Sequence, residues 1–339
     1  MQERGAVPQL LGKESTREGF ARGVLRAAEE DERVVVIGMD VTGSLQLAAF
    51  KDRFPKRFIS VGIAEQNGAG IAAGLALSGF RPVFATYATF ATTRALDQIR
   101  VSICYNNAPV VIGGAHAGLS VGPDGATHQA LEDIATMRVL PHMKVLTPLD
   151  SNQAETMAYY ALRKHEEGPL YIRLGRAAVA NFTDASKAYD PAEVTLYRFG
   201  EAPRLLLLAC GTMLYPALNA GKELAQEGVS TAVVGVSCVK PFDVDAIVRY
   251  IELLNVQGVV TVEEHQVGGG FGSIVAEMLS CVRPVKMLRI GVKDSFGESG
   301  SPDDLLAKYK LDSAGIAEQV REFTLWGQSG NVVESHCEG

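Results

Sequence analysis

The stretch Phe58-Ile-Ser-Val-Gly-Ile-Ala-Glu-Gln-Asn67 runs from an apolar segment of β type directly into a single carboxylate, Glu65. A helix rich in small residues is predicted to follow, and these residues are Gly68, Ala69, Gly70, Ala72, Ala73 and Gly74. Each glycine inside a helix costs about 0.5–1 kcal/mol relative to alanine, so we expect this helix to need a close backbone approach, as at a subunit interface. Taken alone, a carboxylate at a strand end is most often a helix N-cap or a surface charge.

Short apolar runs recur on both sides of this stretch, with helical stretches between several of them. The runs cover residues 34–37, 58–63, 82–86, 109–113, 144–147 and 170–174. Helical periodicity covers residues 91–104 and 151–164. Runs that are apolar throughout indicate strands covered on both faces, and strands alternating with helices indicate a parallel sheet.

The rhythm is lost over residues 178–203, where Asn, Asp, Ser and Pro gather, and a second unit follows. In it we predict strands at 205–209, 231–236 and 258–262, and helices at 214–227, 243–253 and 272–279. The fold class is therefore α/β, with two three-layer α/β/α domains built on mainly parallel sheets. The predicted boundaries are an N-terminal extension 1–11, a first domain 12–178, a linker 179–203, a second domain 204–325 and a flexible tail 326–339.

Composition and charge limit the classes of function. A chain of 339 residues, 47% hydrophobic and 21% charged, can bury two cores. The net charge of −7, without a block of lysine or arginine, argues against a nucleic-acid partner. No apolar run reaches the ~18 residues that span a membrane, and no secretory signal pattern opens the chain, so we expect a cytoplasmic protein. The widely spaced cysteines predict reduced thiols rather than disulfides or a zinc site.

Polar side chains follow nearly every predicted strand of the first domain. They are Asp40, Glu65, Tyr87, His116 and Arg176. In an open parallel sheet, ligands bind at the carboxyl ends of the strands. Chance could place one or two polar groups there in a structural protein, but this number of them indicates a binding site.

Three segments of the first domain together resemble the pyrimidine-binding half of transketolase. They are the stretch around Glu65, Tyr87-Ala-Thr-Phe90 and Gly118-Leu-Ser-Val-Gly-Pro-Asp-Gly-Ala-Thr-His128, and the resemblance extends over nearly residues 12–320. It implies thiamine diphosphate as cofactor and Glu65 as the carboxyl that hydrogen-bonds N1′ of its aminopyrimidine. This contact favours the imino tautomer, whose 4′ nitrogen removes the C2 proton. We expect the apolar neighbours of Glu65 to keep that carboxyl protonated.

The resemblance also assigns the residues around the cofactor. Tyr87 and Phe90 match the aromatic positions that wall the aminopyrimidine, although spacing alone describes core aromatics equally well. Asp40, at the end of its strand, is grouped with them as a cofactor-binding residue.

The sugar-binding residues follow from the same resemblance. His116, Asp124 and His128 match positions that contact the sugar hydroxyls, and the two histidines are the expected proton carriers. A lone histidine is more often structural, but two within one glycine-rich stretch favour a site. Arg17, Ser44 and Arg176 match positions that hold the sugar phosphate, because two guanidinium groups and a hydroxyl suit a phosphate. The alternative for each arginine is a solvated surface charge.

One half of the expected site is missing from the sequence. The Gly-Asp-Gly…Asn signature that binds the metal and the diphosphate in this family is not present. The resemblance therefore implies that Mg²⁺ or Ca²⁺ is bound mainly by a partner, an N-terminal transketolase subunit that carries the diphosphate-binding domain. The expected assembly is an α2β2 heterotetramer with phosphorylated sugars as substrates.

Several related functions remain as alternatives. The β subunits of 2-oxo acid dehydrogenases usually carry Thr-Glu-Gln in place of Ala64-Glu-Gln66. Deoxyxylulose-phosphate synthases share Ala-Glu-Gln but usually have arginine in place of His116. These residues favour a split transketolase that transfers a two-carbon ketol unit between phosphorylated sugars. A non-catalytic, regulatory transketolase-like subunit is the alternative from a different class.

Overall fold

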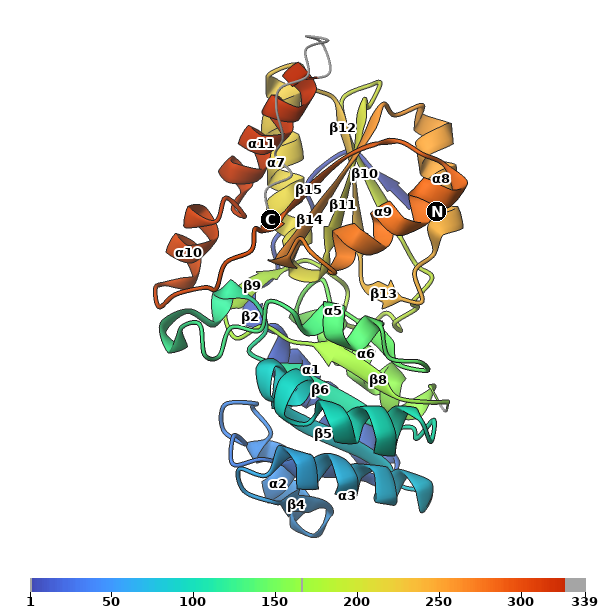
Figure 1. The fold of residues 1–339 in the computed structure, drawn as a ribbon, viewed down its shortest axis with the longest axis vertical. Helices are drawn as coiled ribbons and strands as arrows, with labels where there is room; N and C mark the ends of the chain where they lie inside the picture. The colour runs from blue at the N-terminus through green and yellow to red at the C-terminus, as the bar shows by residue number, and fades with distance from the viewer. Residues whose placement is uncertain (1, 166, 327–339) are drawn as a thin grey trace.

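Figure 1 shows the computed structural model of the chain, which describes residues 2–165 and 167–326. The first half of the chain forms one layered α/β unit at the bottom of the view, and most of the second half forms another above it. The predicted fold class is therefore confirmed. Residues 327–339 of the predicted flexible tail lie outside the described residues.

The larger sheet forms the centre of the first unit. Its strands are β3 (Val34–Gly38), β4 (Phe58–Ser60), β5 (Arg81–Tyr87), β6 (Val111–Ala115), β7 (Lys144–Leu146), β8 (Leu170–Arg173) and β13 (Cys238–Lys240). They lie in the order β13-β7-β8-β6-β5-β3-β4 and run parallel, except that β13 is antiparallel to β7. Every residue of β3, β5 and β6 is buried, as apolar runs covered on both faces require.

Helices cover both faces of this sheet. One core cluster includes residues of α1 (Thr16–Glu30) and α6 (Ser151–Arg163), and another includes residues of α3 (Glu65–Leu77). The helical segment after β5 has hydrogen bonds partly of π type, and its parts are η2 (Phe90–Arg94), α4 (Leu96–Gln98) and η3 (Ile99–Cys104). The shorter elements are α2 (Ala48–Arg53), η1 (Pro55–Arg57), η4 (Leu119–Asp124) and α5 (Asp133–Arg138).

The smaller sheet forms the second unit. Its strands are β1 (Gln2–Arg4), β10 (Thr195–Phe199), β11 (Leu205–Cys210), β12 (Thr231–Val236), β14 (Gly258–Gln266) and β15 (Lys286–Val292), in the order β1-β10-β12-β11-β14-β15. Its helices are η5 (Gly211–Met213), α7 (Leu214–Gln226), α8 (Val244–Leu254), α9 (Phe271–Val282), α10 (Pro302–Lys308) and α11 (Ser313–Trp326). Residues of α7 and α11 share one core cluster, whereas those of α8 and α9 belong to another.

The structure contains strands where none was predicted. β10 lies inside the predicted linker and is antiparallel to β12, and β9 (Ala178–Asn181) pairs with β2 (Gly12–Ser15). These strands are short and only partly buried, so their stability comes from tertiary neighbours rather than from a local pattern. The run predicted as a strand over 58–63 ends at Ser60, because Gly62 then adopts φ +70°.

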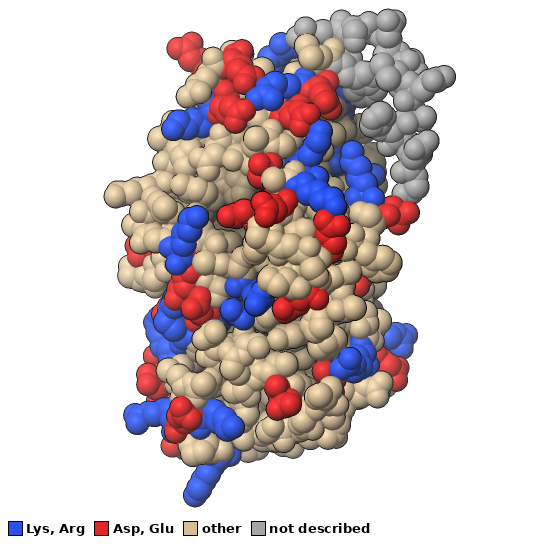
Figure 2. Space-filling model, turned by 90° about the vertical axis from the view of Figure 1, so that its left-hand side faces the viewer, with Lys and Arg blue, Asp and Glu red and all other residues tan. Residues whose placement is uncertain are grey.

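The surface carries both signs of charge. On the face drawn in Figure 2, acidic and basic side chains are interspersed among large neutral areas. The described residues of this face therefore form no continuous basic stripe of the kind that follows a phosphate backbone. Over residues 2–165 and 167–326, no helix has the length and apolar character needed to cross a membrane.

Candidate functional site

The predicted residues collect at the carboxyl-terminal edge of the larger sheet. Asp40 follows β3, Tyr87 ends β5, His116 follows β6 and Arg176 lies shortly after β8. Glu65 is the first residue of α3, which follows β4. The strands that precede these residues are parallel, so their carboxyl ends open onto the same edge of the sheet.

Glu65 is buried, with 2% of its surface exposed, and it has a charged partner that the sequence did not reveal. The Arg94 guanidinium donates to Glu65 Oε2 at 2.9 Å, and its carbon Cζ lies 4.3 Å from the ring centre of Phe90. The expected apolar surroundings are only partly present, because Ile63 is 76% exposed. The chain alone therefore presents Glu65 in an ion pair with Arg94, a partner that is not among the predicted apolar neighbours.

Four rings pack together beside this pair. Tyr87 stacks on His116 with ring centres 3.9 Å apart and an angle of 27°, and on Phe90 at 5.6 Å and 26°. His128 meets Tyr87 and Phe90 edge-on at 5.7 and 5.5 Å. The predicted aromatic and histidine residues thus form one cluster, contributed by β5, η2 and the loop after β6.

His116 is held in an unusual conformation with one nitrogen unsatisfied. Its φ is +58°, in the left-handed region that non-glycine residues rarely adopt. Its ring is buried, and Nδ1 has no hydrogen-bond partner among the described residues. Burial and the positive charges of Arg17 and Arg176 lower the pKa of His116 to about 3, so the ring is neutral at physiological pH. A neutral imidazole with a free nitrogen can exchange a hydrogen bond with a ligand hydroxyl.

Two guanidinium groups approach the same region. Arg17 Nη1 donates to the backbone oxygen of Ser44 at 2.6 Å, and Arg176 Nη1 donates to the backbone oxygen of Val121 at 2.7 Å. Burial and the nearby charge of Arg176 lower the pKa of Arg17, whereas the charge of Asp124 raises it. Because the charges of Arg17 and Arg176 repel each other, an anion bound beside both of them would stabilise this arrangement. In the structure, Ser44 contributes its carbonyl to this site, whereas the sequence pointed to its hydroxyl.

The site has one open end. Asp40 is exposed, with φ +56°, and it belongs to the site only by its place after β3. Asp124 is also exposed. Over residues 2–165 and 167–326, no group of three or more His, Cys, Asp or Glu side chains could hold a metal ion. This part of the chain therefore includes no candidate metal centre.

Comparison with known proteins identifies the family. A family model described as the transketolase pyrimidine binding domain matches residues 13–181, and one described as the transketolase C-terminal domain matches residues 198–316. The chain is 37% identical to a putative transketolase C-terminal section of Methanocaldococcus jannaschii, over 90% of this chain and 95% of that relative. A solved structure described as a split gene transketolase, an inactive β4 tetramer, is 40% identical and superposes with a TM-score of 0.82, covering 91% of this chain and 97% of the other.

A further relative is a longer protein. The chain is 37% identical to a 1-deoxy-D-xylulose-5-phosphate synthase of Geobacter metallireducens, covering 95% of this chain but 51% of that relative. The chain thus spans about half the length of this relative, whereas it spans nearly the whole of the transketolase C-terminal section. Because both family models match and together cover most of its residues, the chain belongs to the transketolase family, of which it carries the pyrimidine-binding and C-terminal domains.

Proposed function

We propose that this chain is the C-terminal subunit of a split, thiamine-diphosphate-dependent transketolase that transfers a two-carbon ketol unit between phosphorylated sugars. The observation that supports this most is the meeting of a buried carboxylate, a cluster of rings and a pair of guanidinium groups at one sheet edge. Each group suits a different part of such a reaction, and the same edge brings them together.

The residues beside Glu65 fit the pyrimidine end of the cofactor. When bound, thiamine diphosphate supplies the nucleophilic carbon that carries the two-carbon unit. Glu65 Oε2 is taken by Arg94, and a carboxyl group has a second oxygen for a ring nitrogen. The rings of Tyr87 and Phe90 and the exposed side chain of Ile63 would provide apolar contacts to a flat heterocycle. Asp40 would complete this end of the site.

The remaining residues fit a phosphorylated sugar. Neutral His116 would exchange hydrogen bonds with a hydroxyl near the reacting carbon, and His128, which packs against the same rings, would help move its proton. Asp124 would accept a hydrogen bond from a sugar hydroxyl. Arg17 and Arg176 would bind the phosphate, which relieves the repulsion between their charges.

The diphosphate and its metal need a second protein. Hard cations such as Mg²⁺ or Ca²⁺ bind clustered oxygen ligands, and the described residues offer no such cluster. We assign this half of the site to an N-terminal subunit that carries the diphosphate-binding domain. The 40% identical split gene transketolase is an inactive β4 tetramer, and its inactivity supports the proposal that a chain of this kind needs a partner.

One face of the chain suits assembly into an α2β2 heterotetramer. Gly70 and Gly74 lie on the exposed side of α3, and a Cβ added to either would meet open space. Nearby residues of α3, η3 and their ends expose large apolar side chains, namely Ile63, Leu77, Phe80, Val101 and Tyr105. An exposed apolar surface around a helix of small residues is typical of a subunit interface.

Reconstitution tests this function. The chain would be mixed with the separately purified partner, thiamine diphosphate and Mg²⁺, and ketol transfer from xylulose 5-phosphate followed as release of the shortened aldose. The partner would be the product of a neighbouring reading frame that carries Gly-Asp-Gly…Asn. We expect activity from the mixture and none from the chain alone. Robust turnover by the single chain, or formation of deoxyxylulose phosphate in place of ketol transfer, would refute the proposal.

A further inference from the structure

The second unit holds the loop that carries the sugar-binding residues. We define the substrate loop as residues 116–128, which begin at His116 and end at His128. Within it, the backbone N–H of Ser120 donates to Oε1 of Glu264 at 2.6 Å. Glu264 lies on β14 of the smaller sheet and is 6% exposed. A short hydrogen bond to a buried carboxylate is stronger than one between neutral groups, so this contact anchors the loop.

The loop glycines show how closely the two units meet. Gly118 has φ +84°, and a Cβ built on it would lie 2.5 Å from the carboxyl carbon of Glu264. Gly125 has φ +73°, and its Cβ would lie 2.6 Å from Ser299 Oγ. Side chains at these positions would push the loop away from the second unit. The glycines therefore permit the close contact that the Glu264 hydrogen bond requires.

The same short segment also holds Arg176. Ser120, whose N–H binds Glu264, is followed by Val121, whose carbonyl accepts from Arg176 Nη1 at 2.7 Å. The two contacts lie at opposite ends of one dipeptide. A shift of Ser120 would thus move the acceptor that holds the Arg176 guanidinium.

The backbone of Glu264 is also held by a hydrogen bond, which Arg173 donates. Arg173 Nη2 donates to the backbone oxygen of Glu264 at 2.8 Å, while its Nε donates to Asp133 Oδ2 at 2.9 Å. Arg173 lies on β8, so the strand that leads to Arg176 also anchors the residue that holds the loop. Glu264, on a strand of the second unit, is therefore bound to the first unit through both its carboxylate and its backbone oxygen.

We propose that Glu264 is a positioning residue for phosphate recognition, which fixes Arg176 through the segment Ser120–Val121. The inference rests on the proposed function in one respect, that Arg176 binds the sugar phosphate. It gives the second unit, which contributes no residue to the candidate site described above, a role in substrate affinity.

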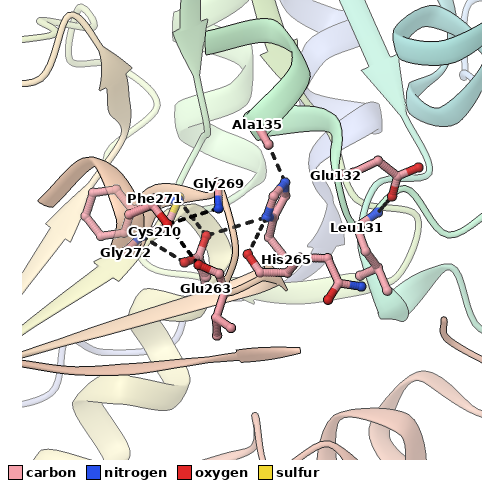
Figure 3. Close-up of polar contacts among 12 residues, drawn as sticks. Leu131, Glu132, Ala135, Cys210, Glu263, His265, Gly269, Phe271 and Gly272 are labelled. Carbon is pink, nitrogen blue, oxygen red and sulfur yellow. Dashed lines mark hydrogen bonds and ion pairs between the residues drawn. The ribbon is translucent and has the colours of Figure 1, made fainter. Parts of the chain in front are cut away.

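Glu263 provides a matched control. It adjoins Glu264, is also buried, and also accepts from backbone N–H groups, namely those of Phe271 at 2.6 Å and Gly272 at 2.8 Å. Figure 3 shows its carboxylate directed at the start of α9, inside the second unit, with His265 beside it. A Glu263→Leu variant therefore loses a comparable buried carboxylate without a direct contact to the substrate loop.

The first test uses hydrogen–deuterium exchange on the isolated chain and needs no activity. Glu264→Leu should increase exchange in peptides from residues 117–125 by about tenfold, on the scale of one lost charge-assisted hydrogen bond. Glu264→Gln keeps the shape and an acceptor oxygen and should give an intermediate increase, and it serves if the leucine variant fails to fold. Glu263→Leu should leave these peptides unchanged. Unchanged loop exchange in both Glu264 variants would overturn the proposed anchor, whatever reaction the protein catalyses.

The second test uses the reconstituted enzyme and compares sugars with and without a phosphate. Glu264→Leu should raise KM for the phosphorylated sugar about tenfold more than for its unphosphorylated counterpart, with Glu264→Gln in between. Glu263→Leu should leave this ratio as in the wild type. An equal loss on both sugars would show that Glu264 only stabilises the fold. If hydrogen exchange in the substrate loop increases but the ratio of the two KM values does not change, the loop contact has no effect on phosphate recognition and the positioning role is refuted.

Discussion

Arg94 Nη1 donates to Glu65 Oε2 at 2.9 Å, so the buried carboxylate at the start of α3 is bound to a guanidinium from the helical segment after β5. The Arg94 side chain is 45% exposed, whereas that of Glu65 is 2% exposed. The pair thus joins a buried anion to a cation at the rim of the site. In the absence of cofactor, Arg94 supplies the charge compensation that a buried carboxylate needs.

Replacing Glu65 by glutamine tests its proposed chemical role. Glutamine keeps the size and can still accept a hydrogen bond from Arg94, so the melting temperature of the chain should change little. It cannot act as the acid that favours the imino tautomer, so turnover of the reconstituted enzyme should fall by about two orders of magnitude or more. Ketol transfer near the wild-type rate would show that another group activates the cofactor.

Removing either arginine of the phosphate site should act on one class of substrate. Charge-assisted hydrogen bonds contribute about 1.5–3 kcal/mol each, so Arg17→Ala or Arg176→Ala should raise KM for phosphorylated sugars about 10–100-fold. KM for unphosphorylated sugars should change little. Arg26→Ala is a control on the same helix as Arg17. The Arg26 guanidinium packs on the ring of Tyr159, 4.1 Å from its centre, and is not one of the proposed phosphate ligands. Equal losses on both substrates would indicate a structural role for the arginines.

Buried His116 should make the fold sensitive to acid. Its pKa is about 3 in the folded chain, mainly because of burial, against 6.5 for an ordinary histidine. Between these values the unfolded chain binds the extra proton, so His116 lowers the free energy of unfolding as pH falls from 6.5 towards 3. His116→Gln should show a shallower loss of stability between pH 7 and pH 5 in urea unfolding. Parallel pH profiles for variant and wild type would contradict the low pKa.

Substitutions at the exposed glycines of α3 should affect the stability of the isolated chain and its association with the partner differently. Gly74→Ala adds a methyl group in open space and should stabilise the isolated chain by about 0.5–1 kcal/mol, because alanine favours a helix. Gly74→Leu should weaken association, measured by sedimentation of the chain with its partner. Gly68→Ala is the buried control: its Cβ would lie 2.8 Å from Met39 Sδ, so it should destabilise the chain itself. Unimpaired assembly of Gly74→Leu would place the interface elsewhere.

The central strands, and the places of the residues that directly follow them, could be predicted because these signals are local. The runs at 34–37 and 82–86 are apolar on both faces and became β3 and β5. Tyr87 and Phe90 were assigned by resemblance, and their rings do pack together. A local sequence pattern is enough to predict a strand and the residue that directly follows it.

Contacts between distant segments could not be predicted. The pairing of Arg94 with Glu65 depends on how the irregular helical segment turns against α3, and no spacing in the sequence encodes this. Glu264 was visible only as one of two adjacent acids, although the two bind backbone groups in different units. The strands β10 and β13 are short and have weak patterns, so only the completed sheets reveal them.

Each sheet includes a short strand from the other half of the chain. β13, from the second half of the chain, lies along β7 at the edge of the larger sheet, while β1, from the first residues described, lies along β10 in the smaller one. A cut between residues 181 and 195 would therefore not release two independent modules, because each fragment would lack a piece of its own sheet. The backbone N–H and C=O groups of β7 that pair with β13 would then be exposed and could pair with a strand of another chain. Engineers who wish to swap one half for that of a relative must carry residues 238–240 with the first unit and residues 2–4 with the second.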